Sequence, residues 1–190
     1  GIGRGVDQGT NSGSVVLMVN SGQISVHGGK ASHGIENYLA AHPAAEQPAI
    51  VNSGSITVTD ETPLADSAGL LLNVASRAKV WNSGTITADY AIKVLASSSY
   101  QPGGDKSLTV YNSGSLNGAV QLSAYDDILI NTSKIAGSVN LGSGNDLYDG
   151  RLGTLNGTLD GYDGDDTLLA GAGDQTIVGG FGNDILSGGA

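Results

Sequence analysis

Aspartates recur at nearly regular intervals towards the end of the chain, and glycines precede them at fixed spacings. The stretches LGSGNDLYD (141–149), GYDGDDTLL (161–169) and GGFGNDILS (179–187) follow, with one substitution in each of the first two, the pattern G-G-x-G-x-D-x-U-x, where U is a large aliphatic residue. Ca²⁺ takes about six to eight oxygen ligands. Glycine-rich turns let carbonyl oxygens point at such an ion beside the Asp carboxylate. The spacing therefore predicts calcium sites between successive turns.

The predicted ions lie between aspartates one turn apart. We expect Asp146 and Asp166 to flank one Ca²⁺, and Asp166 and Asp184 to flank another. The other predicted ligands are turn residues of the same stretches: Gly142, Gly144, Asp163, Gly164, Gly180, Gly182 and Asn183. In AGAGDQTIV (170–178) Gln175 replaces the Asp, so that side is expected to be weaker or empty. Asp127 in LSAYDDILI lacks the glycines and is predicted to hold no metal. A solvated acidic surface is the alternative, but it leaves the glycine spacing unexplained.

The elements that position these turns are visible in a second repeat, the tripeptide Asn-Ser-Gly at Asn11, Asn20, Asn52, Asn82 and Asn112. Aliphatic residues or Met stand two positions before each Asn-type turn: Met18, Ile50, Val80, Val110 and Leu129. Others stand four positions after it: Ile24, Ile56, Ile86, Leu116 and Ile135. A third apolar site follows at Ile35, Leu70, Ile92, Val120 and Val139. This alternation predicts about three short strands in each coil of a solenoid.

The asparagines have a structural interpretation. Asn and Gly tolerate left-handed backbone conformations, and an Asn amide can both donate to and accept from the same amide one coil away. Stacking at about 4.8 Å would give a hydrogen-bonded ladder. Its predicted members are Asn20, Asn52, Asn82, Asn112 and Asn131. A surface recognition role is the alternative.

From residue 112 the insertions disappear and the coils shorten to about 19 residues, with the Asp-rich end continuing the same winding. We therefore predict an all-β, right-handed parallel β-helix. Residues 1–140 would carry Asn-Ser-Gly coils with loop insertions, and residues 141–190 the calcium coils. The stretch GIENYLAAH (34–42) is the one candidate for a helical turn. The insertions at 27–49, 59–79 and 96–107 are the expected contact loops.

Composition limits the partners. The chain has 190 residues with 31 Gly, no Cys and a net charge of −10, so phosphate-rich nucleic acid is excluded as a partner. No apolar stretch is long enough for a transmembrane helix. The sequence opens without a signal peptide and runs in mid-pattern at both ends, which we interpret as a segment of a longer protein.

Two family resemblances accompany these patterns. Residues 141–190 resemble the repeats-in-toxin (RTX) calcium β-roll proteins. Residues 11–140, with VNSGSITV, VWNSGTITA and VYNSGSL, resemble passenger regions of bacterial autotransporter adhesins. The resemblance implies a bacterial, exported protein that is extracellular or on the outer cell surface, with Ca²⁺ as its cofactor. The ligand stays open between a glycan, a protein and self-association. The sequence contains no translocating barrel or terminal secretion signal, so the export route stays open.

Catalysis is the competing interpretation, because polysaccharide lyases and epimerases also use β-helices and some carry calcium nonapeptides. The candidates are two separate groups: Arg77, Lys79 and Lys93, and then His27, His33 and His42. The histidines could form a weak metal cluster, but a solvated loop fits them better. No nucleophile elbow occurs. We predict a non-enzymatic, calcium-stabilised stalk or adhesive passenger; the alternative is a polysaccharide-acting enzyme or its calcium module.

Overall fold

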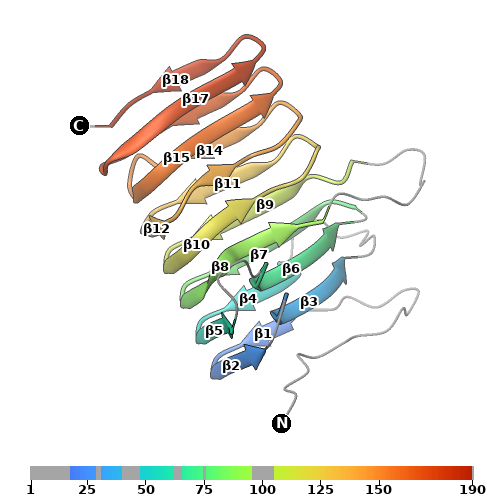
Figure 1. Ribbon diagram of the computed structural model, residues 1–190. Helices are drawn as coiled ribbons and strands as arrows, with labels where there is room; N and C mark the ends of the chain where they lie inside the picture. The colour runs from blue at the N-terminus through green and yellow to red at the C-terminus, as the bar shows by residue number, and fades with distance from the viewer. Residues whose placement is uncertain are drawn as a thin grey trace.

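The computed structural model describes residues 18–28, 31–39, 48–61, 66–74, 76–95 and 105–189 of the chain. Within these ranges the secondary structure consists of eighteen strands and no helix. The chain winds in successive coils, and equivalent strands of neighbouring coils pair in parallel, so the coils stack along one axis (Figure 1). The prediction of an all-β, parallel-stranded solenoid is confirmed at this level.

Two sheets run along the stack, and every pairing within them is parallel. Sheet A takes one strand from each coil, in the order β1 (Met18–Asn20), β4 (Ile50–Asn52), β7 (Ala78–Asn82), β9 (Leu108–Asn112), β11 (Ile128–Asn131), β14 (Leu147–Asp149), β16 (Thr167–Leu169) and β18 (Ile185–Ser187). Sheet B takes the rest: β2 (Gln23–Gly28), β3 (His33–Leu39), β5 (Ser55–Asp60), β6 (Ala68–Val74), β8 (Thr85–Val94), β10 (Ser115–Gln121), β12 (Lys134–Ala136), β13 (Val139–Asn140), β15 (Thr154–Asp163) and β17 (Gln175–Phe181). The backbone groups of each coil are thus satisfied by the coils above and below.

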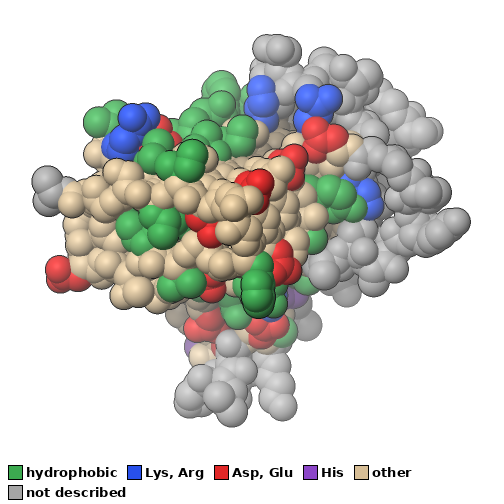
Figure 2. All heavy atoms as spheres, turned by 90° about the horizontal axis from the view of Figure 1, so that it is seen from above, with side chains coloured by type: hydrophobic (Ala, Val, Ile, Leu, Met, Phe, Trp, Pro, Cys, Tyr) green, Lys and Arg blue, Asp and Glu red, His purple; other side chains and the backbone are tan. Residues whose placement is uncertain are grey.

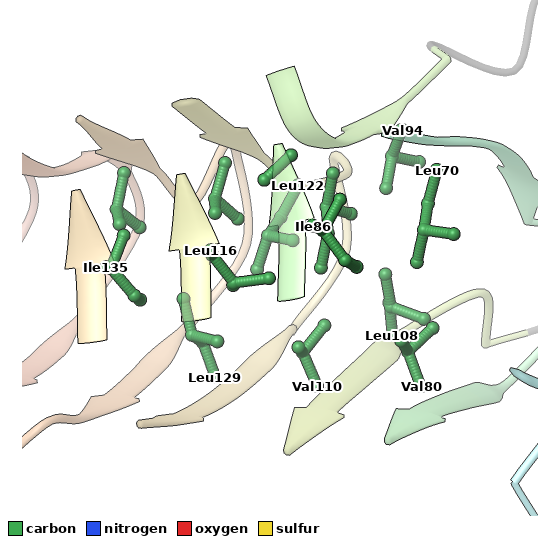
Figure 3. Packing of buried hydrophobic residues seen from close by; sticks show 14 of the residues in the cluster. Leu70, Val80, Ile86, Val94, Leu108, Val110, Leu116, Leu122, Leu129 and Ile135 are labelled. Atoms are coloured by element: carbon green, nitrogen blue, oxygen red, sulfur yellow. The ribbon is translucent and has the colours of Figure 1, made fainter. Parts of the chain in front are cut away.

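The core consists of three stacked rows of apolar, mainly aliphatic side chains, which are the three apolar sites of the sequence repeat. The row in sheet A runs Met18, Ile50, Val80, Val110, Leu129, Tyr148, Leu168 and Leu186. The second row runs Ile24, Ile56, Ile86, Leu116, Ile135 and Leu155. The third runs Ile35, Leu70, Ile92, Val120, Val139, Leu159 and Ile177. Figure 3 shows side chains of the two sheets facing one another across this core. The predicted strand alternation is confirmed.

The coils change length along the axis. Equivalent asparagines are 32, 30 and 30 residues apart in the first coils, and then 19 residues apart between Asn112 and Asn131. Equivalent aspartates then follow at 19, 20 and 18 residues. Both sheets continue across residues 140 and 141, since β14 pairs with β11 in sheet A and β15 pairs with β12 and β13 in sheet B. The Asp-rich coils therefore extend the same stack.

Two expectations about the insertions need correction. Residues 34–39 of the expected helical turn (34–42) lie in strand β3, because the backbone pairs in register with β6 from His33↔Ala68 to Leu39↔Val74. Residues 40–42 lie outside the described residues. The expected loops 27–49 and 59–79 contain β3 and β6, so much of each is sheet. The third insertion, 96–107, is described only from residue 105.

Candidate metal site

The corner that follows each sheet A strand is built from stacked asparagines, and we call it the asparagine corner. Each side-chain Nδ2 donates to Oδ1 of the Asn one coil further on. These bonds join Asn20, Asn52, Asn82, Asn112 and Asn131, at 2.8, 2.7, 2.7 and 2.8 Å. The last four are buried. Their second amide hydrogen goes to the carbonyl oxygen two residues on, at 3.2 to 3.4 Å. A column of buried amides is thus satisfied by its own neighbours.

The glycines of these turns have a role other than the one expected from the sequence. In the described turns neither the Asn nor the Gly has a positive φ angle, so no left-handed backbone is used there. Instead, the turns pack very closely. A Cβ on Gly54 would lie 1.9 Å from the Gly22 carbonyl oxygen, and one on Gly84 would lie 1.9 Å from the Gly54 oxygen. Glycine is required here because each turn lies directly on the one below.

The asparagine ladder ends at Asn131. The next coil has Gly150 at the equivalent place, one residue after Asp149, which pairs with Ile130. The ring of Tyr148 takes the freed space, since a Cβ on Gly150 would lie 2.4 Å from Tyr148 Cε1. The Tyr148 hydroxyl is buried and has no hydrogen-bond partner. In the later coils, side-chain hydrogen bonds between neighbouring coils are made at the opposite corner, before each sheet A strand.

The corner that precedes the last four sheet A strands, which we call the aspartate corner, brings Asp127 and three of the predicted ligands, Asp146, Asp166 and Asp184, into one column. One carboxylate oxygen, Oδ1, accepts the backbone N–H of the Asp one coil earlier. Asp127 donates to Asp146 at 2.6 Å, Asp146 donates to Asp166 at 2.8 Å, and Asp166 donates to Asp184 at 3.0 Å. The first three are at most 3% exposed, whereas Asp184 lies in the last coil and is partly exposed.

The second oxygen, Oδ2, separates these aspartates into two kinds. In Asp127 it accepts from the backbone N–H and the hydroxyl of Ser123, at 2.7 and 2.8 Å, while its Oδ1 accepts from Leu108 N–H. Both oxygens of Asp127 are therefore fully used. In Asp146 and Asp166, Oδ2 is buried and has no hydrogen-bond partner. Burying a carboxylate oxygen without a hydrogen-bond donor costs free energy. A positively charged partner would therefore stabilise these two atoms.

Gly161 lies beside Asp166 Oδ2 and beside a carbonyl oxygen of the next turn. A Cβ added there would lie 2.3 Å from Asp166 Oδ2 and 2.4 Å from the carbonyl oxygen of Gly179, which belongs to the next turn. A carboxylate oxygen and a carbonyl oxygen from two successive turns thus lie near each other beside Gly161, where a side chain would clash with both. Oxygens of these two kinds are the ligands that Ca²⁺ takes in proteins. The residues present fit this ion.

Burial and mutual repulsion act on the carboxyl groups of the column. Loss of hydration raises the pKa of Asp127 to about 6 and that of Asp146 to about 8, and the pKa of Asp166 is raised for the same reason. The negative charges of neighbouring aspartates raise the pKa of Asp146 and Asp166 further. Without a positive partner, this corner therefore favours protonated carboxyls.

The predicted glycines of the aspartate corner do adopt left-handed conformations. The φ angles are 105°, 124°, 136°, 110° and 132° at Gly142, Gly144, Gly164, Gly180 and Gly182. Tyr162 occupies the same position as Gly142 and Gly180 and has a φ of 80°. The turn geometry thus persists where the sequence departs from glycine, at the expense of backbone strain in Tyr162.

Asp163 and Asn183 lie on the rim of this corner rather than beside the free Oδ2 atoms. Asp163 is exposed and accepts a 3.4 Å bond from the Ser143 hydroxyl. Asn183 is exposed and donates its backbone N–H to Asp165 Oδ1 at 2.8 Å. It belongs to a second, outward column in which each side-chain oxygen accepts the N–H of the next coil: Asp126, Asn145, Asp165 and Asn183. Sequence reasoning missed this column, although its residues directly precede the four aspartates.

Gln175 shows how the opposite side of the stack differs. Its Nε2 donates to the carbonyl oxygen of Gly171 at 2.9 Å. The Gln175 amide thus donates to a turn carbonyl oxygen that a cation on this side would otherwise take as a ligand. The expectation of a weaker or empty site on this side rests on the missing charge, and this hydrogen bond supplies a second physical reason.

The other candidate residues lie apart from this site. His27 contacts Thr59 and Glu61, and His33 contacts Glu36, so the two histidines belong to separate pairs; His42 is outside the described residues. Arg77 pairs with Asp105, and Lys93 pairs with Asp66. In the described parts of the chain no three His, Cys, Asp or Glu side chains group closely enough to hold a metal by themselves, so backbone oxygens would be needed.

None of the described segments is a helix long and apolar enough to cross a membrane. Comparison of the sequence with protein-family models, with curated proteins and with solved structures gave no match. The functional assignment therefore depends on the site itself and on the sequence patterns.

Proposed function

We propose that this chain is a non-enzymatic, calcium-stabilised segment of a secreted or surface-exposed bacterial protein, wound as a right-handed β-helix and serving as an adhesive passenger or stalk. One observation carries the calcium assignment: the Oδ2 atoms of Asp146 and Asp166, in residues at most 3% exposed, have no hydrogen-bond partner. The glycine spacing and the convergence of Asp166 Oδ2 with the Gly179 carbonyl support it.

Two ions would lie in the aspartate corner, one between Asp146 and Asp166 and one between Asp166 and Asp184. Carbonyl oxygens of the glycine turns at 142–144, 161–164 and 179–182 would complete the ligand sets. When bound, Ca²⁺ supplies the positive charge and the oxygen coordination that the buried carboxylates lack. Asp127 would hold no ion, because Ser123 and Leu108 already use both of its oxygens.

Calcium binding would then be coupled to winding of the last coils. The aspartate column fixes one coil to the next through carboxylate bonds to backbone N–H groups, at 2.6 to 3.0 Å. Without the ion, the stacked charges repel and the glycine turns gain chain entropy, both of which oppose this arrangement. In calcium-poor cytosol these coils would stay loose, and extracellular calcium would close them.

The adhesive or stalk role follows from the resemblance to autotransporter passengers and from the outer surface of sheet B. Its outward residues on β2, β5, β8 and β10 are mainly Ser, Thr and Asn, and Asn117 Nδ2 donates to Thr87 Oγ1 at 3.2 Å. A flat surface of hydroxyl and amide groups suits binding or spacing more than polysaccharide cleavage, which needs grouped ionisable side chains. This surface favours the adhesin over the lyase or epimerase alternative.

Calorimetry of the 190-residue chain in excess chelator, in calcium and in magnesium tests the proposal, with bound metal counted by equilibrium dialysis. We expect two calcium ions per chain and a melting temperature that rises with calcium concentration, as linkage requires for an ion that binds only the folded state. Magnesium should act weakly, because it demands near-octahedral geometry and dehydrates reluctantly. A melting profile unchanged by calcium, with no metal retained, would refute the proposal.

A further inference from the structure

The outer surface of sheet A is unusually apolar. Side chains alternate across a strand, so the neighbours of the buried row point away from the core. Those outward residues are Val19, Val51, Lys79, Trp81, Thr109, Tyr111, Ile128, Ile130, Leu147, Asp149, Thr167, Leu169, Ile185 and Ser187. Nine of these fourteen are aliphatic or aromatic. Trp81 and Tyr111 are 45% and 39% exposed, and their rings meet edge to face at 6.1 Å. We call this surface the sheet A face.

The polar surface of sheet B makes this composition informative, because both surfaces belong to the same stack. Parallel sheets that are covered on both sides have nearly continuous apolar strands, whereas sheets with one wet side alternate. Strands such as ILIN (128–131) and TLL (167–169) in sheet A are of the first kind, and SITV (55–58) in sheet B is of the second. Contiguous exposed apolar surface marks an interaction site. Seen from the end that holds β18, hydrophobic side chains reach the surface in several patches (Figure 2).

We propose that the sheet A face is a self-association surface, on which a second copy of this chain packs face to face with its coils running in the opposite direction. The inference is independent of the calcium assignment. Aliphatic side chains such as Ile128, Ile130 and Leu169 suit another protein surface of the same kind, since two sheets pack closely when apolar side chains of both interdigitate.

The two charged residues of the face select the orientation. Lys79 lies on β7, the third of eight strands in sheet A, and Asp149 lies on β14, the sixth. Full overlap of two antiparallel copies places the third strand of one on the sixth of the other, so Lys79 faces the strand of Asp149. Parallel copies would oppose Lys79 to Lys79. Asp149 is held by Arg151 through bonds of 2.9 and 2.7 Å, and a carboxylate has acceptor capacity for an ammonium group as well.

The same overlap places the central strands β9 and β11 on one another, which brings Tyr111 of each copy to the middle of the interface, close to Ile130. Large aromatic side chains near the centre usually dominate interface energy. Eight strands about 4.8 Å apart and about 10 Å long cover roughly 400 Å² per copy. This is about half of a standard interface, which buries about 800 Å² per partner. The dimer should therefore be weak, with dissociation at micromolar or higher concentration.

Sedimentation velocity from about 1 µM to about 500 µM tests the proposal on three proteins. The unmodified chain should shift from monomer to dimer as concentration rises. Ile130→Lys places a charge at the centre of the face and should weaken association at least about tenfold. Asn117→Lys adds the same charge on the polar surface of sheet B and should leave it unchanged. Circular dichroism establishes that both variants are folded.

Cross-linking tests the orientation, because the chain has no cysteine of its own. With a bifunctional maleimide reagent that spans about 10 to 15 Å, Lys79→Cys mixed with Asp149→Cys should give a cross-linked dimer, because face-to-face sheets lie about 10 Å apart, and each variant alone should give little. A chain that stays monomeric at all concentrations would overturn the proposal. Equal weakening by Asn117→Lys, or a monomer that instead binds neutral phosphatidylcholine vesicles through this face, would overturn it as well.

Discussion

The asparagine and aspartate corners lie at opposite ends of the sheet A strands, and both stack buried polar side chains from one coil to the next. An amide is donor and acceptor at once, so each Asn passes a hydrogen bond to its neighbour and the column is complete. A carboxylate only accepts. In Asp146 and Asp166 one oxygen takes a backbone N–H and the other stays without a partner. A column of neutral amides therefore satisfies its own hydrogen bonds, whereas a column of carboxylates requires a positively charged partner.

The two corners also use glycine for different reasons. In the asparagine corner Gly54 and Gly84 give the space for turns to lie directly on one another, with ordinary backbone angles. In the aspartate corner Gly144 and Gly164 are needed for conformation, at φ angles of 124° and 136°. The columns overlap in a single coil, the one that holds both Asp127 and Asn131. In that coil Ser123 and Leu108 satisfy the carboxylate completely.

The largest expected effect comes from placing an aspartate in the asparagine corner. Asn82→Asp removes the donor that serves Asn112 Oδ1 and the Gly84 carbonyl oxygen, and leaves a charge at a site 1% exposed. An uncompensated buried charge of this kind destabilises a protein by about 3 to 5 kcal/mol. Urea unfolding should show this loss equally in calcium and in chelator.

Asn117→Asp is the matched control for that change, because Asn117 lies on the outer surface of sheet B and its amide donates to Thr87 Oγ1 there. It should alter the free energy of unfolding by less than about 1 kcal/mol. Equal losses in the two variants would contradict the view that the asparagine column is a buried, self-satisfied unit.

The second prediction concerns pH in the absence of calcium. Burial raises the pKa of Asp127 from 3.8 to about 6 and that of Asp146 to about 8, so the folded chain holds these protons more tightly than the unfolded chain. The stability that they contribute is complete below about pH 4 and is lost as pH rises through about 6 and then about 8. For Asp127 alone the change in pKa corresponds to about 3 kcal/mol.

Chelator-treated protein should therefore unfold at progressively lower urea concentration between pH 5 and pH 8. The lower limit lies above the titration of Asp105 and Asp149, whose pKa values are lowered by their hydrogen bonds and act in the opposite direction. With saturating calcium Asp146 stays ionised and its part of the slope should disappear, whereas the part due to Asp127, which holds no ion, should remain. If the slope of stability against pH is the same with and without calcium, calcium does not bind at the aspartate corner.

The third prediction makes the aspartate corner resemble the asparagine corner. In Asp166→Asn, Oδ1 can still accept the Asp146 N–H, and the new amide can donate to the nearby Gly179 carbonyl, as Gln175 does to Gly171. The variant should be more stable than the unmodified chain in chelator. It should also lose the calcium increment, which is about 2.7 kcal/mol for each ion at a calcium concentration a hundred times its Kd, because both proposed ions share Asp166.

Asp127→Asn is the control for that variant. It brings an amide donor against the N–H groups that the carboxylate accepts, so it should destabilise the chain by about 1 to 3 kcal/mol in every buffer. Its calcium increment should be unchanged. If Asp127→Asn abolishes the calcium response and Asp166→Asn keeps it, the proposed sites are assigned to the wrong coils.

Particular residues show how far the sequence could predict these differences. Alternation of aliphatic residues around the Asn turns was enough to find all three core rows, because the pattern has the same phase in every coil. The helical turn expected at residues 34–42 was wrong for residues 34–39, where pairing with β6 overrides the local helical preference. The spacing of Asp146, Asp166 and Asp184 placed them in one column.

Side-chain geometry could not be predicted in the same way. That Asp127 is fully satisfied depends on the rotamers of Asp127 and Ser123, and that Asp166 is not depends on which donors its turn happens to present. The outward column of Asp126, Asn145 and Asp165 was missed because alternating Asp and Asn at exposed positions looks like ordinary surface composition. The space filled by Tyr148 at the end of the asparagine ladder has no sequence signal apart from Gly150.

The smallest expected effect tests the conformational use of glycine in the aspartate corner. Tyr162 has a φ of 80°, while Gly142 and Gly180 at the equivalent positions have 105° and 110°. A left-handed conformation costs a residue with a Cβ about 1 to 2 kcal/mol. Tyr162→Gly should remove that strain and raise the free energy of unfolding by about 1 kcal/mol, since the residue is 52% exposed and its side chain makes little packing to lose. Tyr162→Ala keeps the Cβ and should give no gain. If Ala stabilises as much as Gly, the ring rather than the backbone is the source of strain, and the turn needs glycine only for space, as the asparagine corner does.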